Sequence, residues 1–305
     1  MPSTHSKLMS ASRRATIRAN LFPAAHSAVE PWDSFRWHSA SGESCDTWKR
    51  HSSQALAIDV FGTIKVASAR DIVLDRLADE IGLPVGGPWT LELEWANPDN
   101  PLHERQPTWV DAVARNARSL IFFECKFTET DGGSCSQTRP LVSGPYKGLT
   151  QCNGSYMWQV NPVNHQESRC ALTAKGIRYW EAVSRVFDYA ADGSYVRCPF
   201  AGPRFQWMRN LTNCWVAAQQ ADLQAAFVVV YANGPGLAMA ERVKSPLWLD
   251  FQSRLQPDAI LFRTMPYQQI VAFAQDAVPH DPLWPELAAW VTQKIDSVCQ
   301  RIERK

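Results

Sequence analysis

Residues 120–127 constrain the fold of this chain more than any other segment. They form an apolar run of strand length that contains two charged residues, Glu124 and Lys126. Because side chains alternate between the two faces of a strand, this charged pair shares one face, and Phe123 and Cys125 point to the other. A carboxylate and an ammonium within an apolar strand are costly unless they have partners or a function. The segment therefore predicts a buried strand that presents a charged pair.

Two strand candidates precede this segment and place a second carboxylate near Glu124. Residues 90–95 alternate between apolar and polar side chains, and residues 108–113 form a second short strand candidate. A hairpin that turns near Asn116 would bring Asp111 close to opposite Glu124. We therefore expect two carboxylates to converge beside one lysine.

This trio fits the hydrolysis of phosphodiester bonds. Mg²⁺ prefers oxygen ligands and is usually held by one or two carboxylates, and Mn²⁺ accepts similar ligands. Such an ion polarises a phosphate and makes a water molecule more acidic. Asp111 and Glu124 would hold the ion. Lys126 would orient or help to deprotonate the attacking water and would offset the developing negative charge.

The remaining pattern predicts an α/β fold of the α+β kind, with helices packed on a mixed sheet. Periodicity marks helices over residues 52–65, 173–187, 203–220, 266–276 and 284–302, and strands over 226–231 and 258–263. Ser52 and Ser53 are a good helix start, and Pro203 is expected to be the first residue of its helix. The core order is therefore helix, three strands, helix, strand.

We divide the chain into three regions. Residues 1–50 form an N-terminal arm or loose cap, and residues 51–265 form the core. An insertion at about 130–200, rich in Gly, Ser, Pro and Asn, separates the third strand from the second helix. Residues 266–305 form a C-terminal helical extension.

Composition favours a soluble globular protein. The chain has 305 residues, of which 45% are hydrophobic and 20% are charged, enough for a sizeable core. Its net charge of +1 lacks the basic excess common in nucleic-acid-binding proteins, so phosphate contacts would have to come from local clusters. No apolar run reaches the length of a membrane helix and no secretory signal is visible. These features predict a cytoplasmic protein with reduced cysteines and no membrane contact.

Asp111 followed by Glu124-x-Lys126 resembles the motif of the PD-(D/E)xK nuclease superfamily, which has the restriction-endonuclease-like fold. The strings at residues 52–55, 127–129 and 205–210 are similar to one bacterial branch of that superfamily. The resemblance runs from about residue 50 to about residue 265. The sequence departs from the motif at Val110, where the name motif has proline.

This resemblance implies an αβββαβ core, a nuclease activity and Mg²⁺ or Mn²⁺ as the cofactor. It implies Asp111 and Glu124 as metal ligands, with the backbone carbonyl of Cys125 as a further ligand. It implies Lys126 as the catalytic lysine. DNA is the implied partner, and RNA stays open as an alternative. Many nucleases of this fold form homodimers, although no interface can be predicted here.

Several polar residues are candidates for supporting roles. Gln54 leans toward the buried side of the first helix, and it or Asp59 would lie near the metal if the superfamily pattern holds. A polar residue that only starts the helix is an equal alternative. Gln206 and Arg209 belong to a polar stripe on the second helix, which faces either the site or solvent. Glu129 is expected to be a surface carboxylate at the strand end.

Four of the eight cysteines lie in the insertion, namely Cys135, Cys152, Cys170 and Cys198. Four thiolates can bind Zn²⁺ or an iron–sulfur cluster. Strong zinc sites usually contain closely spaced cysteine pairs, and the insertion has none. Buried or scattered thiols are therefore the favoured interpretation, and a structural metal is the alternative. The Cys125 side chain is expected to be part of the core.

Three functional hypotheses follow. The first is an active DNA endonuclease, serving restriction or phage defence. The second is a catalytically inactive DNA-binding module with a nuclease fold. The third is a protein of another function that is structured by a cysteine-bound metal. The presence of Asp111, Glu124 and Lys126 together favours the first, because an inactive site would be expected to lose one of them.

Overall fold

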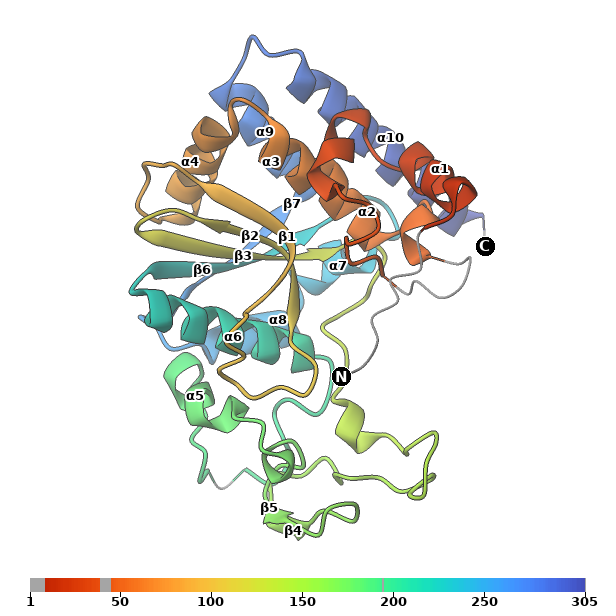
Figure 1. Cartoon of the computed structure of the whole chain (residues 1–305). Coiled ribbons are helices and arrows are strands. Elements are labelled where there is room, and N and C mark those ends of the chain that lie inside the picture. The colour runs from red at the N-terminus through yellow and green to blue at the C-terminus, as the bar shows by residue number, and fades with distance from the viewer. Residues whose placement is uncertain (1–8, 39–44, 194, 305) are drawn as a thin grey trace.

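The computed structural model describes residues 9–38, 45–193 and 195–304. Within them, one five-stranded mixed sheet has the strand order β1-β2-β3-β6-β7 (Figure 1). Its strands are β1 (Thr90–Ala96), β2 (Trp109–Arg115), β3 (Ser119–Lys126), β6 (Gln224–Tyr231) and β7 (Leu261–Pro266). The first three are antiparallel neighbours, whereas β3, β6 and β7 run parallel. The expected mixed sheet is confirmed.

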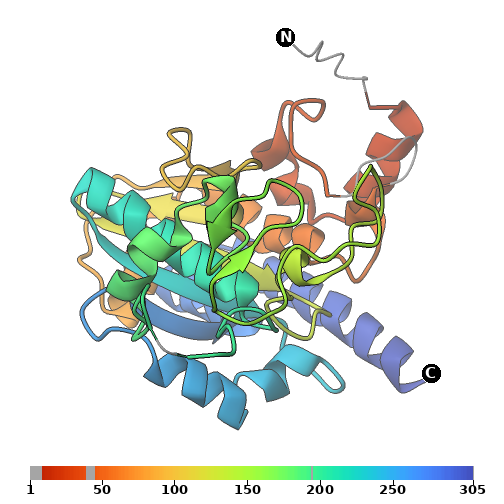
Figure 2. The same cartoon turned by 90° about the horizontal axis from the view of Figure 1, so that it is seen from below.

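Helices cover both faces of the sheet, and each face has its own apolar core (Figures 1 and 2). One face carries α1 (Ala11–Ala19), η1 (Pro23–Val29), η2 (Asp46–Trp48), α2 (Ser53–Ala57), η3 (Ile58–Gly62), α3 (Thr63–Val66), α4 (Arg70–Ile81), α9 (Tyr267–Ala277) and α10 (Leu283–Glu303). The other carries α5 (Tyr179–Val186), α6 (Phe205–Ala221), α7 (Ala238–Arg242) and α8 (Pro246–Ser253). The alternation predicted for β3 is confirmed, because Phe123 and Cys125 belong to the first core and Phe122 to the second.

The first core helix runs through α2, η3 and α3 as one continuous segment with a π-helical turn at its centre. It begins as expected, because the side chain of Ser52 accepts a hydrogen bond from the backbone N–H of Ala55 at 3.2 Å. Gly62 allows close packing on η1, since a Cβ there would lie 3.2 Å from those of Ala25 and Ala28. The N-terminal segment is thereby held against the core.

The segment before the first core helix is not a loose arm where the structure describes it. Ile17, Val29 and Trp32 are each at most 1% exposed and belong to the core of the first face. The expectation of an arm underrated the apolar residues spaced along this serine- and arginine-rich segment, which become buried because α10 and η3 provide a surface for them.

A buried ion pair also ties this segment to the C-terminal helix. Lys294 of α10 pairs with Asp59 of η3 and donates a hydrogen bond to the carbonyl of Asn20. Asp59 also accepts hydrogen bonds from the backbone N–H of Phe22 at 2.7 Å and from the indole of Trp290 at 3.0 Å. Asp59 is therefore a structural residue with fully used oxygens, and its expected alternative place near a metal is wrong.

Three of the expected boundaries differ from the structure for reasons that local contacts explain. The second core helix begins at Phe205 rather than at Pro203, because Arg204 is engaged in a turn with Gly202. The helix expected over 173–187 is split into η5 (Thr173–Lys175) and α5, because Gly176 has a left-handed backbone, φ +82°, that ends the first piece. The last strand starts at Leu261 because a turn occupies the residues before it.

The insertion extends away from the sheet beyond α6 (Figure 1). It contains little regular structure besides α5. Its other elements are η4 (Ser136–Thr138), the two-residue strands β4 (Gln159–Val160) and β5 (Glu167–Ser168), and η5. No helix in the described ranges is both long enough and apolar enough to cross a membrane.

Candidate functional site

Strand register brings three carboxylates into one row across β1, β2 and β3. Ala112 pairs with Phe123, so Asp111 falls beside Glu124 one step further along the ladder. Leu93 pairs with Ala112 and Trp95 with Val110, which places Glu94 beside Asp111 from the other side. The hairpin geometry expected for Asp111 and Glu124 is thus present, and Glu94 extends it.

Lys126 and Glu124 form a buried pair at the end of β3. The Nζ atom of Lys126 lies 2.6 Å from Oε1 of Glu124, and both residues are 6% exposed. Lys126 also donates to Oε1 of Gln206 at 3.2 Å and lies 5.4 Å from the centre of the Trp207 ring. The second Glu124 oxygen accepts a hydrogen bond from Nδ2 of Asn210 at 2.6 Å. Helix α6 therefore orients both charged groups.

The lysine of this pair is held as an ammonium ion. Burial alone would lower the pKa of Lys126, but the nearby carboxylates of Glu124, Glu129 and Asp111 outweigh it and raise the pKa. Without a further cation, Lys126 is therefore a hydrogen-bond donor and a positive charge rather than a base.

The central carboxylate experiences the opposite environment. Burial, followed by the negative charges of Glu124 and Glu94, raises the pKa of Asp111 well above its usual range, despite the opposing charges of Lys126 and His38. Its Oδ2 atom accepts a hydrogen bond from the backbone N–H of Cys125 at 2.7 Å. Excess negative charge in a confined place is the property expected of a site for a divalent cation.

A histidine completes a group suited to a metal ion. One ligand atom from each of His38, Glu94 and Asp111 lies within 4.8 Å of the other two. Glu94 has a left-handed backbone, φ +50°, within β1. The Nε2 atom of His38 lies 3.0 Å from Oε1 of Glu94, and burial is outweighed by Glu94 and Asp111, which raise the pKa of His38.

Gln54 supports this second group from the first core helix. Its Nε2 donates to Oε1 of Glu94 at 2.6 Å and to the carbonyl of Arg36 at 2.8 Å. Its Oε1 accepts a hydrogen bond from the backbone N–H of His38 at 2.9 Å. Gln54 is 1% exposed, so the expected lean toward the buried side is confirmed. Through these bonds it holds Glu94 and His38 in place.

One open pocket of about 620 Å³ is lined by Glu124 and Lys126 and by two members of the second group, His38 and Asp111. Its charged and polar lining includes Arg36, His38, Asp111, Glu124, Lys126, Glu129, Asp131, Gln206 and Arg209. Carboxylate oxygens with one imidazole suit Mg²⁺ or Mn²⁺, so the donor set fits the expected ion. The pocket can thus present a metal-held anion to the Lys126 ammonium.

Comparison with protein families finds that the model of the family described as restriction endonuclease associating with ARP matches residues 10–288. The chain belongs to this family. No match was found in comparisons with curated proteins or with solved structures. The restriction endonuclease family match includes His38 and the cysteine-containing insertion, and it indicates a nuclease-like role for the chain.

Two further residues of the pocket differ in how well the sequence anticipated them. Arg209 lines the pocket as the sharper hypothesis expected, and its Nε lies 3.3 Å from Oδ1 of Asn210. The expectation that Glu129 is a surface carboxylate is wrong. Glu129 is half-buried and accepts hydrogen bonds from the backbone N–H groups of Phe127 and Thr128 at 2.8 and 3.1 Å. Burial is outweighed by the charge of Lys126 and by hydrogen bonds from the Ser53 side chain and the Phe127 backbone, which lower the pKa of Glu129.

The start of α6 is fixed against the loop that follows β3. The backbone N–H groups of Phe205 and Gln206 donate to the carbonyls of Gly133 and Gly132 at 3.2 and 2.8 Å. A Cβ at Gly132 would lie 2.4 Å from the Trp207 ring, so only glycine fits there. This contact places Gln206 and Asn210 over the Glu124–Lys126 pair.

Sequence reasoning missed His38 and Glu94. Glu94 carried a weak signal, because it lies on a strand predicted to neighbour the one with Asp111. His38 carried none, since it lies in a segment interpreted as an arm. The four insertion cysteines do not contribute to the carboxylate pocket but line a separate one, together with Tyr156 and Arg169.

Proposed function

We propose that this protein is a metal-dependent nuclease that hydrolyses phosphodiester bonds in DNA. The observation that carries the proposal is the row of Glu94, Asp111 and Glu124 beside the buried ammonium of Lys126. A purely structural ion pair would not need two extra carboxylates at its side, because they raise the electrostatic cost of the folded state. The restriction endonuclease family match supports DNA as the substrate.

Asp111 is proposed as the central metal ligand. Glu124 would bind from β3, and Glu94 with His38 would bind from the opposite side. The Cys125 backbone carbonyl remains a proposed further ligand. When bound, Mg²⁺ or Mn²⁺ would supply Lewis-acid activation of the phosphate and of the attacking water.

Residues of the chain would orient the reacting groups and stabilise the developing charge. Lys126 donates from a fixed position, so it would orient the attacking water and offset the negative charge that develops on the phosphate. Gln206 and Asn210 keep the lysine and Glu124 from turning away. Arg209, at the rim of the same pocket, would bind a phosphate of the DNA strand. Cleavage of invading DNA in restriction or phage defence is the role that we propose for this activity.

The test is cleavage by the purified full-length chain. Supercoiled plasmid, linear duplex, single-stranded DNA and RNA are incubated with Mg²⁺ or Mn²⁺, with Ca²⁺, or with excess EDTA. We expect DNA to be cut with Mg²⁺ or Mn²⁺ and to remain intact with EDTA. Binding of DNA without cutting under all metal conditions would instead indicate an inactive DNA-binding module and overturn the proposal. Stronger cutting of RNA than of DNA would overturn the substrate assignment.

A further inference from the structure

Four cysteines from separate loops of the insertion converge on one pocket. Cys135, Cys152, Cys170 and Cys198 all line it, although 17 to 28 residues separate successive members in the sequence. Two of them are less than 10% exposed and two are half-buried, and all have free thiols. Scattered thiols would have no reason to meet, so their convergence needs an explanation.

Each of the four sulfur atoms accepts a hydrogen bond from the backbone N–H of the residue two positions later. The donors are Gln137 for Cys135, Gly154 for Cys152, Leu172 for Cys170 and Phe200 for Cys198. Such donors favour the thiolate over the thiol. Arg169 in the pocket wall and Lys175, near Cys135, add positive charge around the sulfurs. Burial nevertheless raises the pKa of Cys135, Cys170 and Cys198, so a bound cation is needed to hold these sulfurs as thiolates.

We propose that Cys135, Cys152, Cys170 and Cys198 bind a metal centre as four thiolates and thereby hold the insertion in its fold. A metal centre would supply the compensating charge that four close thiolates need. It would also explain how a segment of some 70 residues with two-residue strands and short helical turns is fixed in one arrangement.

The spacing of the sulfurs favours an iron–sulfur cluster over a single zinc ion. A tetrahedral zinc with Zn–S bonds of about 2.3 Å brings its sulfurs within roughly 4 Å of one another. In the part of the chain that the structure describes, no three of these sulfurs lie within 4.8 Å of one another. In a cluster of four irons each iron takes one cysteine, so the sulfurs surround a body of several atoms and are further apart.

Metal content and absorbance of the full-length protein test this proposal. The protein is purified without air from iron-supplemented cells, and iron, zinc and acid-labile sulfide are measured per folded chain. We expect iron and sulfide together with broad visible absorbance. One zinc per chain without sulfide would support the thiolate site but overturn the cluster. A folded protein with neither metal would overturn the proposal.

Matched variants locate the metal. Cys152→Ser and Cys198→Ser are each expected to lower the metal per folded chain at least tenfold. Cys45→Ser and Cys299→Ser, at buried cysteines outside the insertion, are expected to leave it unchanged. Lys126→Met should also retain the metal, which separates this centre from the nuclease site. If Cys152→Ser or Cys198→Ser fails to fold, Cys135→Ser and Cys170→Ser take its place. Their metal-to-protein ratio is then compared with that of the wild type and is expected to fall in the same way. Full metal content in a folded Cys152→Ser or Cys198→Ser variant would contradict the assignment.

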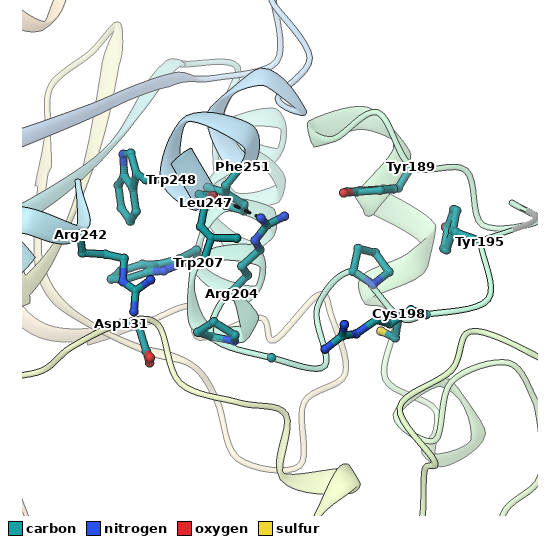
Figure 3. A pocket seen from close by; sticks show the side chains of 14 residues that line it. Asp131, Tyr189, Tyr195, Cys198, Arg204, Trp207, Arg242, Leu247, Trp248 and Phe251 are labelled. Atoms are coloured by element: carbon teal, nitrogen blue, oxygen red, sulfur yellow. Dashed lines mark hydrogen bonds between the residues drawn. The ribbon is translucent and has the colours of Figure 1, made fainter. Parts of the chain in front are cut away.

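A second, independent inference concerns a separate pocket of about 490 Å³ between the end of the insertion and helices α6 and α8 (Figure 3). Its lining combines aromatic residues with three arginines, namely Tyr189, Tyr195, Trp207, Trp248, Phe251, Arg197, Arg204 and Arg242. Figure 3 shows Arg242 and Trp248 on one side and Tyr189 and Tyr195 on the other. Aromatic faces and cations together are the features that bind bases and phosphates.

This pocket adjoins the carboxylate pocket. Asp131 lines both of them, and the ring centre of Trp207, which lines this pocket, lies 5.4 Å from the Nζ atom of Lys126. Arg204 is paired with Asp250 at 2.7 Å. Arg242 donates a hydrogen bond from Nε to the carbonyl of Thr130 at 3.2 Å. Within the described ranges, no carboxylate lies within salt-bridge distance of Arg197 or Arg242, so the positive charge of each is not neutralised by an ion pair.

We infer that the pocket receives an unpaired nucleotide of the substrate strand, an inference that rests on the proposed function. The half-buried rings of Tyr189 and Tyr195 would stack on the base, and Arg242 would bind the adjoining phosphate. The pocket has the size typical of sites for small organic groups. A nucleotide held there would lie beside the metal-binding carboxylates, so the enzyme would favour DNA with an unpaired segment over a fully paired duplex.

Binding without cleavage tests this inference. Fluorescence anisotropy with Ca²⁺ compares a gapped or single-stranded oligonucleotide with a duplex of the same length. We expect Tyr189→Ala and Arg242→Gln to weaken binding of the unpaired DNA about tenfold or more, and to leave duplex binding nearly unchanged. The control Arg115→Gln removes an exposed arginine at the far end of β2. Equal losses for both DNA forms, or none, would overturn the inference. A protein that binds unpaired DNA here but never cuts would retain this inference and refute only the nuclease proposal.

Discussion

Replacing Lys126 with methionine is expected to abolish DNA cleavage while Mn²⁺ binding stays intact or becomes tighter. The ammonium donates to Glu124 and opposes the negative charge of Glu124, Glu129 and Asp111. Its removal takes away both the oriented donor and the positive charge near the reacting phosphate, a loss of about 10²–10⁴-fold in rate. It also removes the cation that competes with a metal for Glu124.

The same substitution should lower the stability of the metal-free protein. Removing one member of a buried ion pair leaves the other charge without compensation and costs about 3–5 kcal/mol. Asn210 still donates to Glu124, so part of this loss is offset. Because Mn²⁺ can replace the missing positive charge, it should raise the unfolding temperature of Lys126→Met more than that of the wild type.

Three measurements on the same preparations check this prediction, namely single-turnover cleavage, Mn²⁺ titration by calorimetry, and thermal unfolding with and without Mn²⁺. Lys244→Met serves as the matched control, because Lys244 is exposed and distant in sequence from the site. Wild-type cleavage rates in Lys126→Met would refute the role of the lysine. Loss of Mn²⁺ binding together with cleavage would mean that Lys126 acts on the architecture of the site rather than on the reaction.

The part of the site that follows from local pattern could be predicted from the sequence. Alternation along β3 fixed the shared face of Glu124 and Lys126, and the short turn near Asn116 set the register that brings Asp111 beside them. Both results depend on neighbouring residues and on backbone geometry common to all strands. That is why the core order of helix, three strands, helix and strand was also predictable.

The part of the site that depends on long-range packing was not predictable. His38 reaches Glu94 because the N-terminal segment folds onto the core and Gln54 binds the backbone N–H of His38. Glu94 joins the site through the pairing of β1 with β2, and the long connection between these strands leaves their register open in the sequence. Neither feature leaves a periodic signal in the sequence.

The four insertion cysteines show the same limit of sequence-based prediction over longer separations in the chain. Their spacing contains no paired motif, so the sequence favoured scattered thiols over a site. The structure brings all four to one pocket through loops whose course no periodicity describes. Spacing rules for metal sites capture ligands that share a turn, whereas ligands contributed by four separate loops become visible only when the chain is folded.

Replacing Asp111 with asparagine is expected to abolish cleavage and yet stabilise the metal-free protein. The pKa of Asp111 is raised above its value in the unfolded chain, chiefly by burial and then by Glu124 and Glu94. The folded state therefore binds the proton more tightly than the unfolded state does. It follows that this carboxyl lowers the stability of the fold as the pH rises from about 4 through the raised pKa. Asparagine removes the charge, and its amide oxygen can still accept from the backbone N–H of Cys125.

The expected result is an unfolding temperature for metal-free Asp111→Asn that exceeds the wild-type value at pH 7 by at least about 2–4 °C, which corresponds to roughly 1 kcal/mol. At pH 4 the two proteins should unfold at nearly the same temperature, because the wild-type carboxyl is then protonated in the fold. Mn²⁺ stabilises whichever protein binds it in the folded state, so it should raise the unfolding temperature of the wild type and leave Asp111→Asn nearly unaffected.

Asp131→Asn is the matched control, because Asp131 lines the same pocket but is not part of the carboxylate row. It should retain the response to Mn²⁺ and show no comparable gain in stability.

A metal-free Asp111→Asn that is less stable than the wild type at pH 7 would show that the carboxylate is compensated in the apo protein. An undiminished response to Mn²⁺ in Asp111→Asn would place the metal elsewhere and refute Asp111 as the central ligand. A purely structural role of Asp111 predicts that its loss weakens the fold. Such a role would not account for an Asp111→Asn protein that is more stable, does not respond to Mn²⁺ and does not cut DNA.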